Sequence, residues 1–456
     1  MRSDKIIVSG ATILPMTEPE CSGSASDGGA KDGDAQKYFT GSVALEGGRI
    51  AIVARDGCAE GEQRLAEFRV KGDFREIDGR GRLLMPGLVN THTHVAMTLM
   101  RNLADDIELM EWLHERVWPF ESRLGAEEIA WGAKLGIAEM LLGGTTTFVD
   151  MYWHEAAIAR VARDMGIRAV LCPSFLDGER MAEFERDLPE TIAVADGCDR
   201  LSVRIAPHAP YTCSEENLRR AIGLAKKYGV GAHTHISETL DEQRIVRERY
   251  GCTPTEHLRN VGLFELPTIA AHCVHVTGGD MDILREFGVT AVHNPQSNMK
   301  IASGAAPVAA MLSRGVNLAI GTDGACSNND LDMWDEMRTA SFLAKHTAAD
   351  PASMPAYEIL KMATVGGARA IGRDGELGVV AEGALADLIM LDLEKPHLCP
   401  RHDLVAALVY SAKSTDVERV FVAGRPVVEN DRVIGLDLPE LMAEVEATVG
   451  RVKQAI

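Results

Sequence analysis

The sequence predicts a (β/α)8 barrel joined to a small β domain that the two ends of the chain build together. Eight short apolar runs alternate with helical stretches between residues 83 and 371, a length that suits this barrel. Nearly every run ends in a histidine or an aspartate. A β-branched, strand-like texture opens the chain and returns only after residue 375. The 456 residues are enough for a barrel with such an appendage.

The two chain ends read as strands separated by turn residues. Residues 5–16 and 41–54 are predicted strands, and strand-like segments return at 375–393 and 417–435. Because strands far apart in the sequence need sheet partners, the two ends are predicted to pair with each other. Residues 21–36 are rich in Gly, Ser and Asp, which predicts a flexible surface insertion.

The chain is therefore predicted to contain two domains. Residues 1–82 and 372–456, with the C-terminal helix included, form the composite β domain, and residues 83–371 form the barrel. Helical stretches such as 127–144 and 214–229 separate the strand-like runs of the barrel, which are 83–94, 145–152, 168–175, 201–210, 230–237, 268–275, 290–295 and 317–324. A doubly wound open sheet is the alternative, but no GxGxxG or GxxxxGK[ST] motif follows the first strand.

The composition excludes several classes of protein. The chain has 47 Lys and Arg residues and 67 Asp and Glu residues, which gives a net charge of −20. Because this charge repels phosphate backbones and anionic lipids, nucleic acids and anionic membranes are not expected as partners. The N-terminus lacks the pattern of a secretory signal, and no window approaches 18 apolar residues, so a cytoplasmic protein is expected. Nine cysteines without a CxxC pair argue against disulfides and a zinc knuckle.

Ionisable side chains fall at the ends of the predicted barrel strands. In a barrel these ends face one mouth, where the active sites of this fold lie. The residues are His92, His94, Asp150, His208, His233, His235, His272, His275, His293 and Asp323.

His92 and His94 are the strongest indication of a metal site. Residues two apart on a strand share a face, so both imidazoles can reach one ion. A third nitrogen ligand from the fifth strand and the carboxylate of Asp323 from the eighth would complete a site of imidazoles and one carboxylate. This set suits Zn²⁺, and Fe²⁺ or Mn²⁺ are also compatible.

His233 and His235 compete for the ligand role on the fifth strand, because both lie on one face. His235 is the predicted ligand, since Glu238 follows three positions later and can turn its carboxylate back toward the metal. His233 is expected to pack deeper or to hold a hydrogen bond. A metal lowers the pKa of its bound water, and Glu238 or His272 is placed to handle the released proton. The roles of His275 and His293 stay open.

The motifs PGLVNTHTH, HISE, AAHCVH, HNPQSNMK and GTDGACSNN, in this order, resemble the amidohydrolase superfamily. More narrowly, they resemble the S-adenosylhomocysteine/5′-methylthioadenosine deaminases and their triazine-hydrolase relatives. The resemblance implies that the terminal strands form a β-sandwich beside the barrel. It also implies one metal per chain, most suitably Zn²⁺, because no bridging lysine ends the fourth strand. The implied metal ligands are His92, His94, His235 and Asp323, with Glu238 as proton shuttle and His272 and Asp323 assisting.

The resemblance also suggests a substrate site. The stretch DDIELMEWLHERVWPFE is similar to that of adenosine-type members, which implies that Glu121 binds the ribose hydroxyls and His208 the purine. Taken alone, Trp112 and Glu121 fit the face of an amphipathic helix and its solvated edge. The resemblance implies instead that both residues contact the substrate. Arg180 matches an arginine that binds the homocysteine carboxylate.

The predicted function is a metal-dependent hydrolytic deaminase of adenosine-type nucleosides. Ser174 stands where a second carboxylate-binding arginine is expected, which leaves S-adenosylhomocysteine, 5′-methylthioadenosine, adenosine and 5′-deoxyadenosine open. The alternative is the same chemistry on another heterocycle, such as a guanine, a pterin or a triazine. A catalytically inactive barrel would need a missing ligand, and the HxE and PCxxC signature of cytidine deaminases is absent. Homo-oligomerisation is left open.

Overall fold

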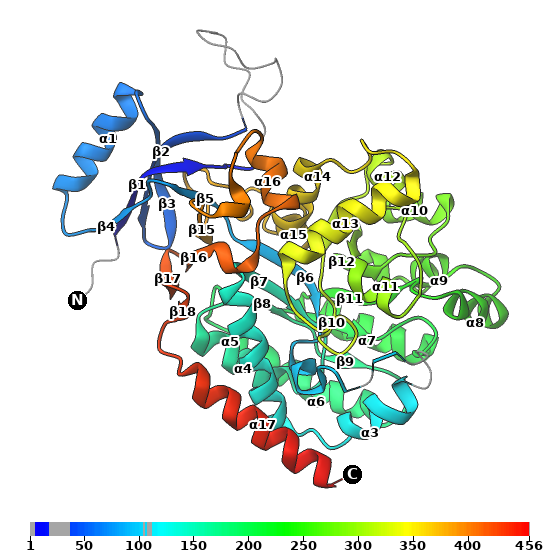
Figure 1. Cartoon of the computed structure of the whole chain (residues 1–456). Coiled ribbons are helices and arrows are strands. Elements are labelled where there is room, and N and C mark those ends of the chain that lie inside the picture. Colours follow the sequence, from blue (N-terminus) through cyan, green and yellow to red (C-terminus); the bar gives the residue numbers. More distant parts are fainter. Residues whose placement is uncertain (1–4, 18–36, 104, 107–111, 456) are drawn as a thin grey trace.

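The computed structural model describes residues 5–17, 37–103, 105–106 and 112–455, without the side chains of residues 112–114, 179 and 455. The chain forms a parallel barrel surrounded by helices and a second sheet beside it (Figure 1). The insertion predicted at 21–36 lies outside the described residues. Among the described residues, no helix combines the length and apolar character needed to cross a membrane.

Eight parallel strands form the barrel, and all eight predicted runs are confirmed. An isolated parallel bridge between Thr93 and Asp323 joins the first strand to the end of the last, so the sheet closes. A short additional strand, β9 (Ser174–Phe175), extends the pairing of β10. The barrel strands are β6 (Leu88–Thr93), β7 (Thr145–Asp150), β8 (Arg168–Leu171), β10 (Leu201–Pro207), β11 (Gly231–Ile236), β12 (Thr268–His272), β13 (Thr290–His293) and β14 (Leu318–Ile320).

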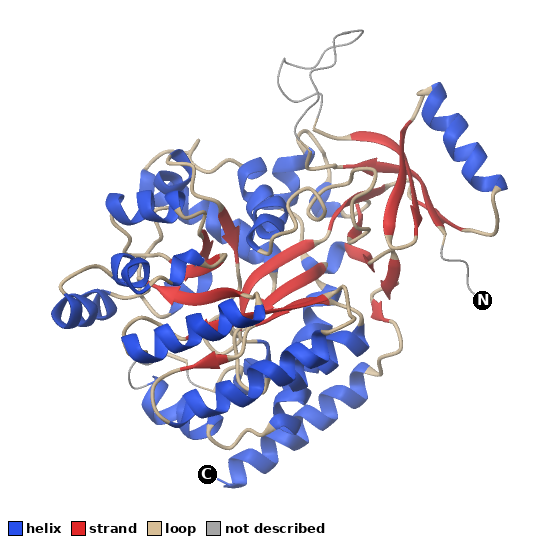
Figure 2. Cartoon of the chain, turned by 180° about the vertical axis from the view of Figure 1, so that it is seen from behind, coloured by secondary structure: helices blue, strands red, loops and turns tan. Residues whose placement is uncertain are grey.

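The barrel strands are buried on both faces, as parallel strands under a helical layer must be. Inside the barrel, Val149, Val170, Ile269 and Val292 form one apolar cluster. The helices cover the outer face (Figure 2). They are α4 (Ala126–Leu142), α5 (Glu155–Met165), α6 (Glu179–Ala195), α7 (Glu215–Tyr228), α8 (Leu240–Tyr250), α9 (Pro254–Val261), α10 (Gly278–Glu286), α11 (Pro295–Lys300), α12 (Val308–Ser313), α13 (Met333–Ala348), α14 (Ala356–Lys361) and α15 (Gly367–Ala370).

Local sequence signals begin and end these helices. Ser214 caps α7 by accepting a hydrogen bond from the backbone N–H of Asn217. Gly229 ends the same helix with a φ of +69°, a conformation that glycine adopts without a steric penalty. Five further short helical elements complete the barrel region. They are η1 (Val95–Met100), η2 (Trp112–Val117), α3 (Trp118–Glu121), η3 (Leu263–Glu265) and η4 (Met362–Gly366).

The two chain ends form one sheet, so their predicted pairing is confirmed. The first predicted barrel run divides at Gly87, because β5 before it pairs with β15 from the C-terminal part while β6 after it enters the barrel. Helix α1 (Ala59–Val70) packs on this sheet. The strands, from one edge to the other, are β18 (Arg432–Val433), β17 (Arg425–Glu429), β16 (Val417–Val422), β15 (Leu388–Asp392), β5 (Arg82–Pro86), β1 (Ile6–Ile13), β2 (Phe39–Glu46) and β3 (Arg49–Arg55), and β4 (Arg75–Asp78) pairs with β1.

The C-terminal helix α17 (Leu438–Ala455), which was predicted to belong to the terminal domain, packs on α4 of the barrel (Figure 1). Its apolar stripe explains this contact, because Leu441, Val445 and Val452 are buried in the same apolar core as residues of α4. The residue limits of the two domains remain a prediction. The other elements after the barrel are η5 (Pro396–Leu398), α16 (Leu404–Tyr410) and η6 (Ser414–Asp416).

Candidate metal centre and substrate cavity

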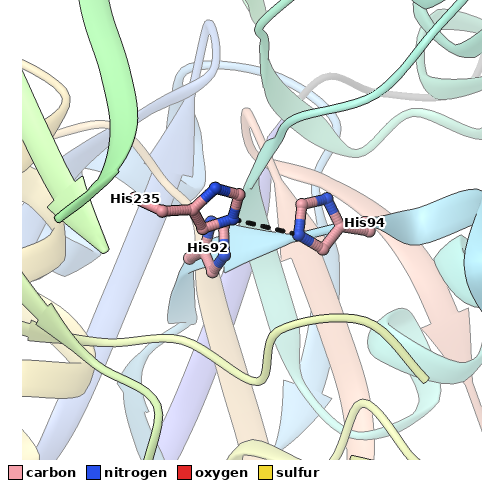
Figure 3. A group of neighbouring side chains, drawn as sticks. All are labelled: His92, His94 and His235. Carbon is pink, nitrogen blue, oxygen red and sulfur yellow. Dashed lines mark hydrogen bonds between the residues drawn. The ribbon is translucent and has the colours of Figure 1, made fainter. Parts of the chain in front are cut away.

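Three imidazoles and one carboxylate converge at the mouth of the barrel. His92 lies in β6, His94 directly after it and His235 in β11 (Figure 3). Asp323 follows β14. Oδ1 of Asp323 lies 3.4 Å from Nε2 of His92 and 3.2 Å from Nε2 of His94, and Nε2 of His235 lies 3.4 Å from that of His94. Two overlapping sets of donors are close enough to share one metal ion. One set is His92, His94 and His235, and the other is His92, His272 and Asp323.

Backbone carbonyls orient two of the imidazoles. Nδ1 of His94 lies 2.6 Å from the carbonyl oxygen of Met151, and Nδ1 of His235 lies 2.7 Å from that of His208. Because a carbonyl oxygen only accepts hydrogen bonds, both Nδ1 atoms carry the proton. In the neutral form of each ring, Nε2 then directs a lone pair toward the centre, as a metal ligand must.

His233 orients the third imidazole. Nδ1 of His92 lies 2.7 Å from Nε2 of His233, whose own Nδ1 lies 3.2 Å from the carbonyl oxygen of Ile269. Nε2 of His92 is buried and has no hydrogen-bond partner among the described residues. A buried nitrogen with a free lone pair, beside two similar nitrogens and a carboxylate, fits a divalent ion such as Zn²⁺.

The charges at this centre favour a cation. Burial lowers the pKa of His92 to about 4. Burial acts on His94 in the same direction, but the neighbouring Asp323 outweighs it and raises the pKa of His94 to about 9. Burial also opposes ionisation of Asp323, yet its two histidine neighbours hold its pKa well below the usual range. The centre thus retains a negative carboxylate that positive charge stabilises.

Asp323 is held from two sides. Its Oδ1 accepts a hydrogen bond of 2.8 Å from the backbone N–H of Gly324, and its Oδ2 accepts one of 2.7 Å from the hydroxyl of Ser297. Its backbone has a φ of +64°, which is uncommon outside glycine and shows how tightly the turn is constrained.

Glu238 and His272 lie next to these donors. Nε2 of His272 is 3.7 Å from Oε1 of Glu238 and 3.9 Å from Oδ2 of Asp323. Burial raises the pKa of Glu238, so its carboxyl group is easier to protonate than an exposed one. The arrangement gives one side chain able to take up a proton and one able to donate a hydrogen bond beside the metal donors.

A cavity opens directly over this centre. Two of the four predicted substrate residues, Glu121 and His208, line it. Oε1 of Glu121 accepts a hydrogen bond of 2.7 Å from the hydroxyl of Tyr152, and burial raises the pKa of Glu121. The lining residues are His94, Met97, Val117, Trp118, Glu121, Met151, Tyr152, Trp153, Ser174, Leu176, His208, Tyr211, Thr212, His235, Glu238, His272, Ile301, Asp323 and Ser327.

The other two predicted substrate residues do not appear among the described lining residues. Arg180 stacks on the ring of Trp153, 4.4 Å from its centroid, and its Nη1 lies 2.6 Å from Oε2 of Glu183. Arg180 therefore lies behind a wall residue of the cavity. Trp112 begins η2, and its side chain lies outside the described part of the chain.

Several residues that line or support the site were not predicted from the sequence. Tyr152 and Trp153 line the cavity directly after β7, so the rule that strand ends carry the site would have found them. Ser297 and Asn298 contact Asp323 and His272. They lie on a helix and not at a strand end, so the strand-end pattern does not predict them. The motif HNPQSNMK, which contains both, is the one signal in the sequence that points to this segment.

The two histidines whose roles were left open do not line the cavity among the described residues. Nε2 of His275 lies 2.8 Å from the carbonyl oxygen of Ser303. His293 is buried at the end of β13, and burial lowers its pKa to about 3, which keeps the ring neutral.

Comparison with known proteins places this site in a family. The sequence model of the amidohydrolase family matches residues 83–427. A protein of Pelotomaculum thermopropionicum named 5-methylthioadenosine/S-adenosylhomocysteine deaminase is 44% identical over 447 residues, which cover 97% of each chain. A protein of Moorella thermoacetica with the same name is 46% identical over 374 residues, 81% of this chain and 87% of the relative.

Solved structures agree with this relationship. An adenosine deaminase from Xanthomonas campestris with bound zinc superposes with a TM-score of 0.89 at 34% identity and covers 98% of both chains. An atrazine chlorohydrolase from Arthrobacter aurescens, at 24% identity and a TM-score of 0.83, covers 97% of this chain and 100% of its own and shares the fold. The resemblance of the motifs is therefore confirmed, and the chain belongs to the amidohydrolase family.

Proposed function

We propose that this protein is a metal-dependent hydrolytic deaminase of adenosine-type nucleosides, which gives the inosine-type product and ammonia. The observation that supports this most is the placement of Glu238 and Glu121 in one cavity over the three imidazoles and Asp323. One carboxyl group lies at the centre, and the other lies where the remainder of a nucleoside would extend. The names of the relatives described above support the same substrate class.

The proposed metal content is one divalent ion per chain, most suitably Zn²⁺, with Fe²⁺ or Mn²⁺ as alternatives. His92, His94, His235 and Asp323 would hold it. When bound, such an ion makes hydroxide available near neutral pH by lowering the pKa of water. The end of β10 carries His208 and no lysine, so the chain offers no bridging lysine for a second ion there.

The side chains around the centre would then handle the protons. Glu238 takes the proton that the attacking water loses and delivers it to the ring nitrogen next to the reacting carbon. Its raised pKa suits a group that must be protonated and deprotonated in one cycle. His272 directs Nε2 toward the same region and steadies developing negative charge. The same carboxyl group then takes the second proton from the hydroxyl that was added to the carbon and delivers it to the amino nitrogen. The carbon–nitrogen bond to the amino group breaks, ammonia leaves, and the hydroxyl oxygen becomes the carbonyl of the product.

The remaining lining residues would orient the nucleoside. Glu121 is the proposed acceptor for the ribose hydroxyls, and His208 the proposed contact for the purine. Arg180 and Trp112 remain proposals as contacts for the 5′ substituent. A cytoplasmic location remains a prediction, and the oligomeric state remains open.

A substrate panel tests the proposal. Ammonia release would be measured with adenosine, 5′-deoxyadenosine, 5′-methylthioadenosine and S-adenosylhomocysteine, beside guanine, a pterin and a chlorinated triazine. Metal content would be measured on the same preparation, with Glu238→Gln as a control that keeps the metal donors. We expect turnover of at least one adenosine-type nucleoside and about one equivalent of metal. Turnover confined to guanine, pterin or triazine would overturn the substrate class.

A further inference from the structure

We propose that Asn298, in the helix α11, is a positioning residue that accepts a hydrogen bond from Nδ1 of His272 and thereby holds the ring with Nε2 toward the cavity. The proposal rests on the proposed deaminase function. Asn298 is not one of the candidate metal donors, and it does not line the cavity among the described residues. Its side chain instead contacts His272 from behind.

The geometry around His272 divides its two ring nitrogens between different partners. Nδ1 lies 2.8 Å from Oδ1 of Asn298, and both residues are buried. Because an amide oxygen only accepts hydrogen bonds, Nδ1 must carry a proton whether the ring is neutral or cationic. Nε2, on the opposite side, faces Oε1 of Glu238 and Oδ2 of Asp323. Nε2 is therefore the ring nitrogen that His272 presents to the donors at the centre.

The backbone of Asn298 is fixed independently of His272. Its N–H donates to the carbonyl oxygen of Asn294 at 3.0 Å, and its own carbonyl oxygen accepts from the N–H of Ser303 at 2.9 Å. His272 has a φ of +72°, so its backbone is in an uncommon conformation for a residue with a side chain. A rigid partner on the neighbouring helix explains how the ring of His272 keeps one orientation.

The amide nitrogen of Asn298 takes no part in the contact with His272. Nδ2 is buried and has no hydrogen-bond partner among the described residues. A leucine of similar size would remove this unpaired donor, but it would also leave Nδ1 of His272 without an acceptor. The oxygen of the amide is thus the atom through which Asn298 acts on His272.

The same helix holds a second group of the centre. The hydroxyl of Ser297 donates to Oδ2 of Asp323 at 2.7 Å, next to the residue that holds His272. Two neighbouring residues of α11 thus contact His272 and Asp323, whose Nε2 and Oδ2 atoms lie 3.9 Å apart. A displaced α11 would move both, and for this reason the test needs a control on the helix itself.

The experiment compares Asn298→Leu, which matches the volume but lacks the acceptor, with Asn298→Asp, which keeps an acceptor oxygen. Gln296→Leu is the matched control, because it removes an amide of α11 that bonds to Thr339 away from the site. We expect Asn298→Leu to lower kcat by about 10- to 100-fold, the usual effect of losing an outer-shell partner, with KM and metal content nearly unchanged. Asn298→Asp should recover most of this loss, and Gln296→Leu should keep the wild-type rate.

Nuclear magnetic resonance of ¹⁵N-labelled histidine gives a readout that does not depend on substrate. In the zinc-loaded wild type, the signal of His272, identified by its loss in His272→Asn, should show a protonated Nδ1, and Asn298→Leu should lose this signature. An unprotonated Nδ1 in the wild type would overturn the proposal even if the deaminase function holds. Equal losses of kcat in Asn298→Leu and Asn298→Asp would also overturn it. If no nucleoside is turned over, the spectra still decide the protonation of His272.

Discussion

Nδ1 of His92 lies 2.7 Å from Nε2 of His233, and this contact sets the position of the proton on both rings. Nδ1 of His233 donates to the carbonyl oxygen of Ile269, so its Nε2 has a lone pair and accepts from His92. His92 then presents an unprotonated Nε2 to the centre. His233 therefore orients a candidate metal donor, whereas His235 is itself a candidate donor.

The two histidines of β11 should respond differently to removal. His235→Ala should lose both metal and activity, because it deletes a donor atom. His233→Ala should keep the metal and bind it about 10- to 100-fold more weakly, as expected for an outer-shell partner. Elemental analysis, followed by competition with a chelator, measures both effects. Loss of metal from His233→Ala with retention in His235→Ala would mean that the roles are reversed.

Glu238→Gln should retain the metal and bind substrate, yet lose about 10²- to 10⁴-fold in kcat, the range for removing a positioned general acid or base. The amide has nearly the same shape but cannot take up the proton. Steady-state kinetics with a metal assay on the same sample separate this loss from a loss of metal. A kcat close to that of the wild type would exclude Glu238 as the proton shuttle.

Glu121 should confer a preference for ribose. A 2′-deoxy substrate leaves this buried carboxyl group partly unpaired, which costs about 1–3 kcal/mol, so adenosine should exceed 2′-deoxyadenosine by roughly 10-fold or more in kcat/KM. Glu121→Ala should remove most of that preference. Tyr152→Phe is the control, because it removes a partner of Glu121 and leaves the carboxyl group itself in place. Equal turnover of both substrates by the wild type would contradict ribose recognition through Glu121.

Arg180 should affect only substrates that carry a carboxylate. Arg180→Ala is expected to lower kcat/KM for S-adenosylhomocysteine by up to roughly 5-fold, the effect of a partly exposed charge pair, and to leave 5′-methylthioadenosine unchanged. Glu183→Gln removes the competing carboxylate and should raise kcat/KM for S-adenosylhomocysteine. Equal losses on both substrates in Arg180→Ala would indicate a structural role through Trp153.

One buried ion pair should be important for stability. Nε of Arg168 in β8 lies 2.8 Å from Oδ2 of Asp387, next to β15, and links the barrel to the terminal sheet. Arg168→Met should destabilise the protein by about 3–5 kcal/mol, because Asp387 would be left charged and buried. Arg160→Met, which breaks an exposed pair with Glu190, is the control and should leave the urea midpoint unchanged. Equal midpoints for the two variants would contradict the link.

The sequence was sufficient to predict the barrel and the candidate donors of the metal centre. Parallel strands have a side-chain period of two and end at one mouth. For this reason His92 and His94, together with strand-end residues such as His235 and Asp323, could be predicted to converge from the amino-acid sequence alone. The pairing of the chain ends followed from the same need of strands for partners.

Other relationships were decided by tertiary structure alone. His233 and His235 share a strand face, and only the packing of β11 against β6 and β12 determines which ring reaches the centre. The contact of Asn298 with His272 joins a helix to a strand 26 residues earlier, and the packing of α17 on α4 joins elements nearly 300 residues apart. A strand period predicts which face a side chain occupies. It does not predict the depth of that side chain or its partner, which depend on how distant elements pack together.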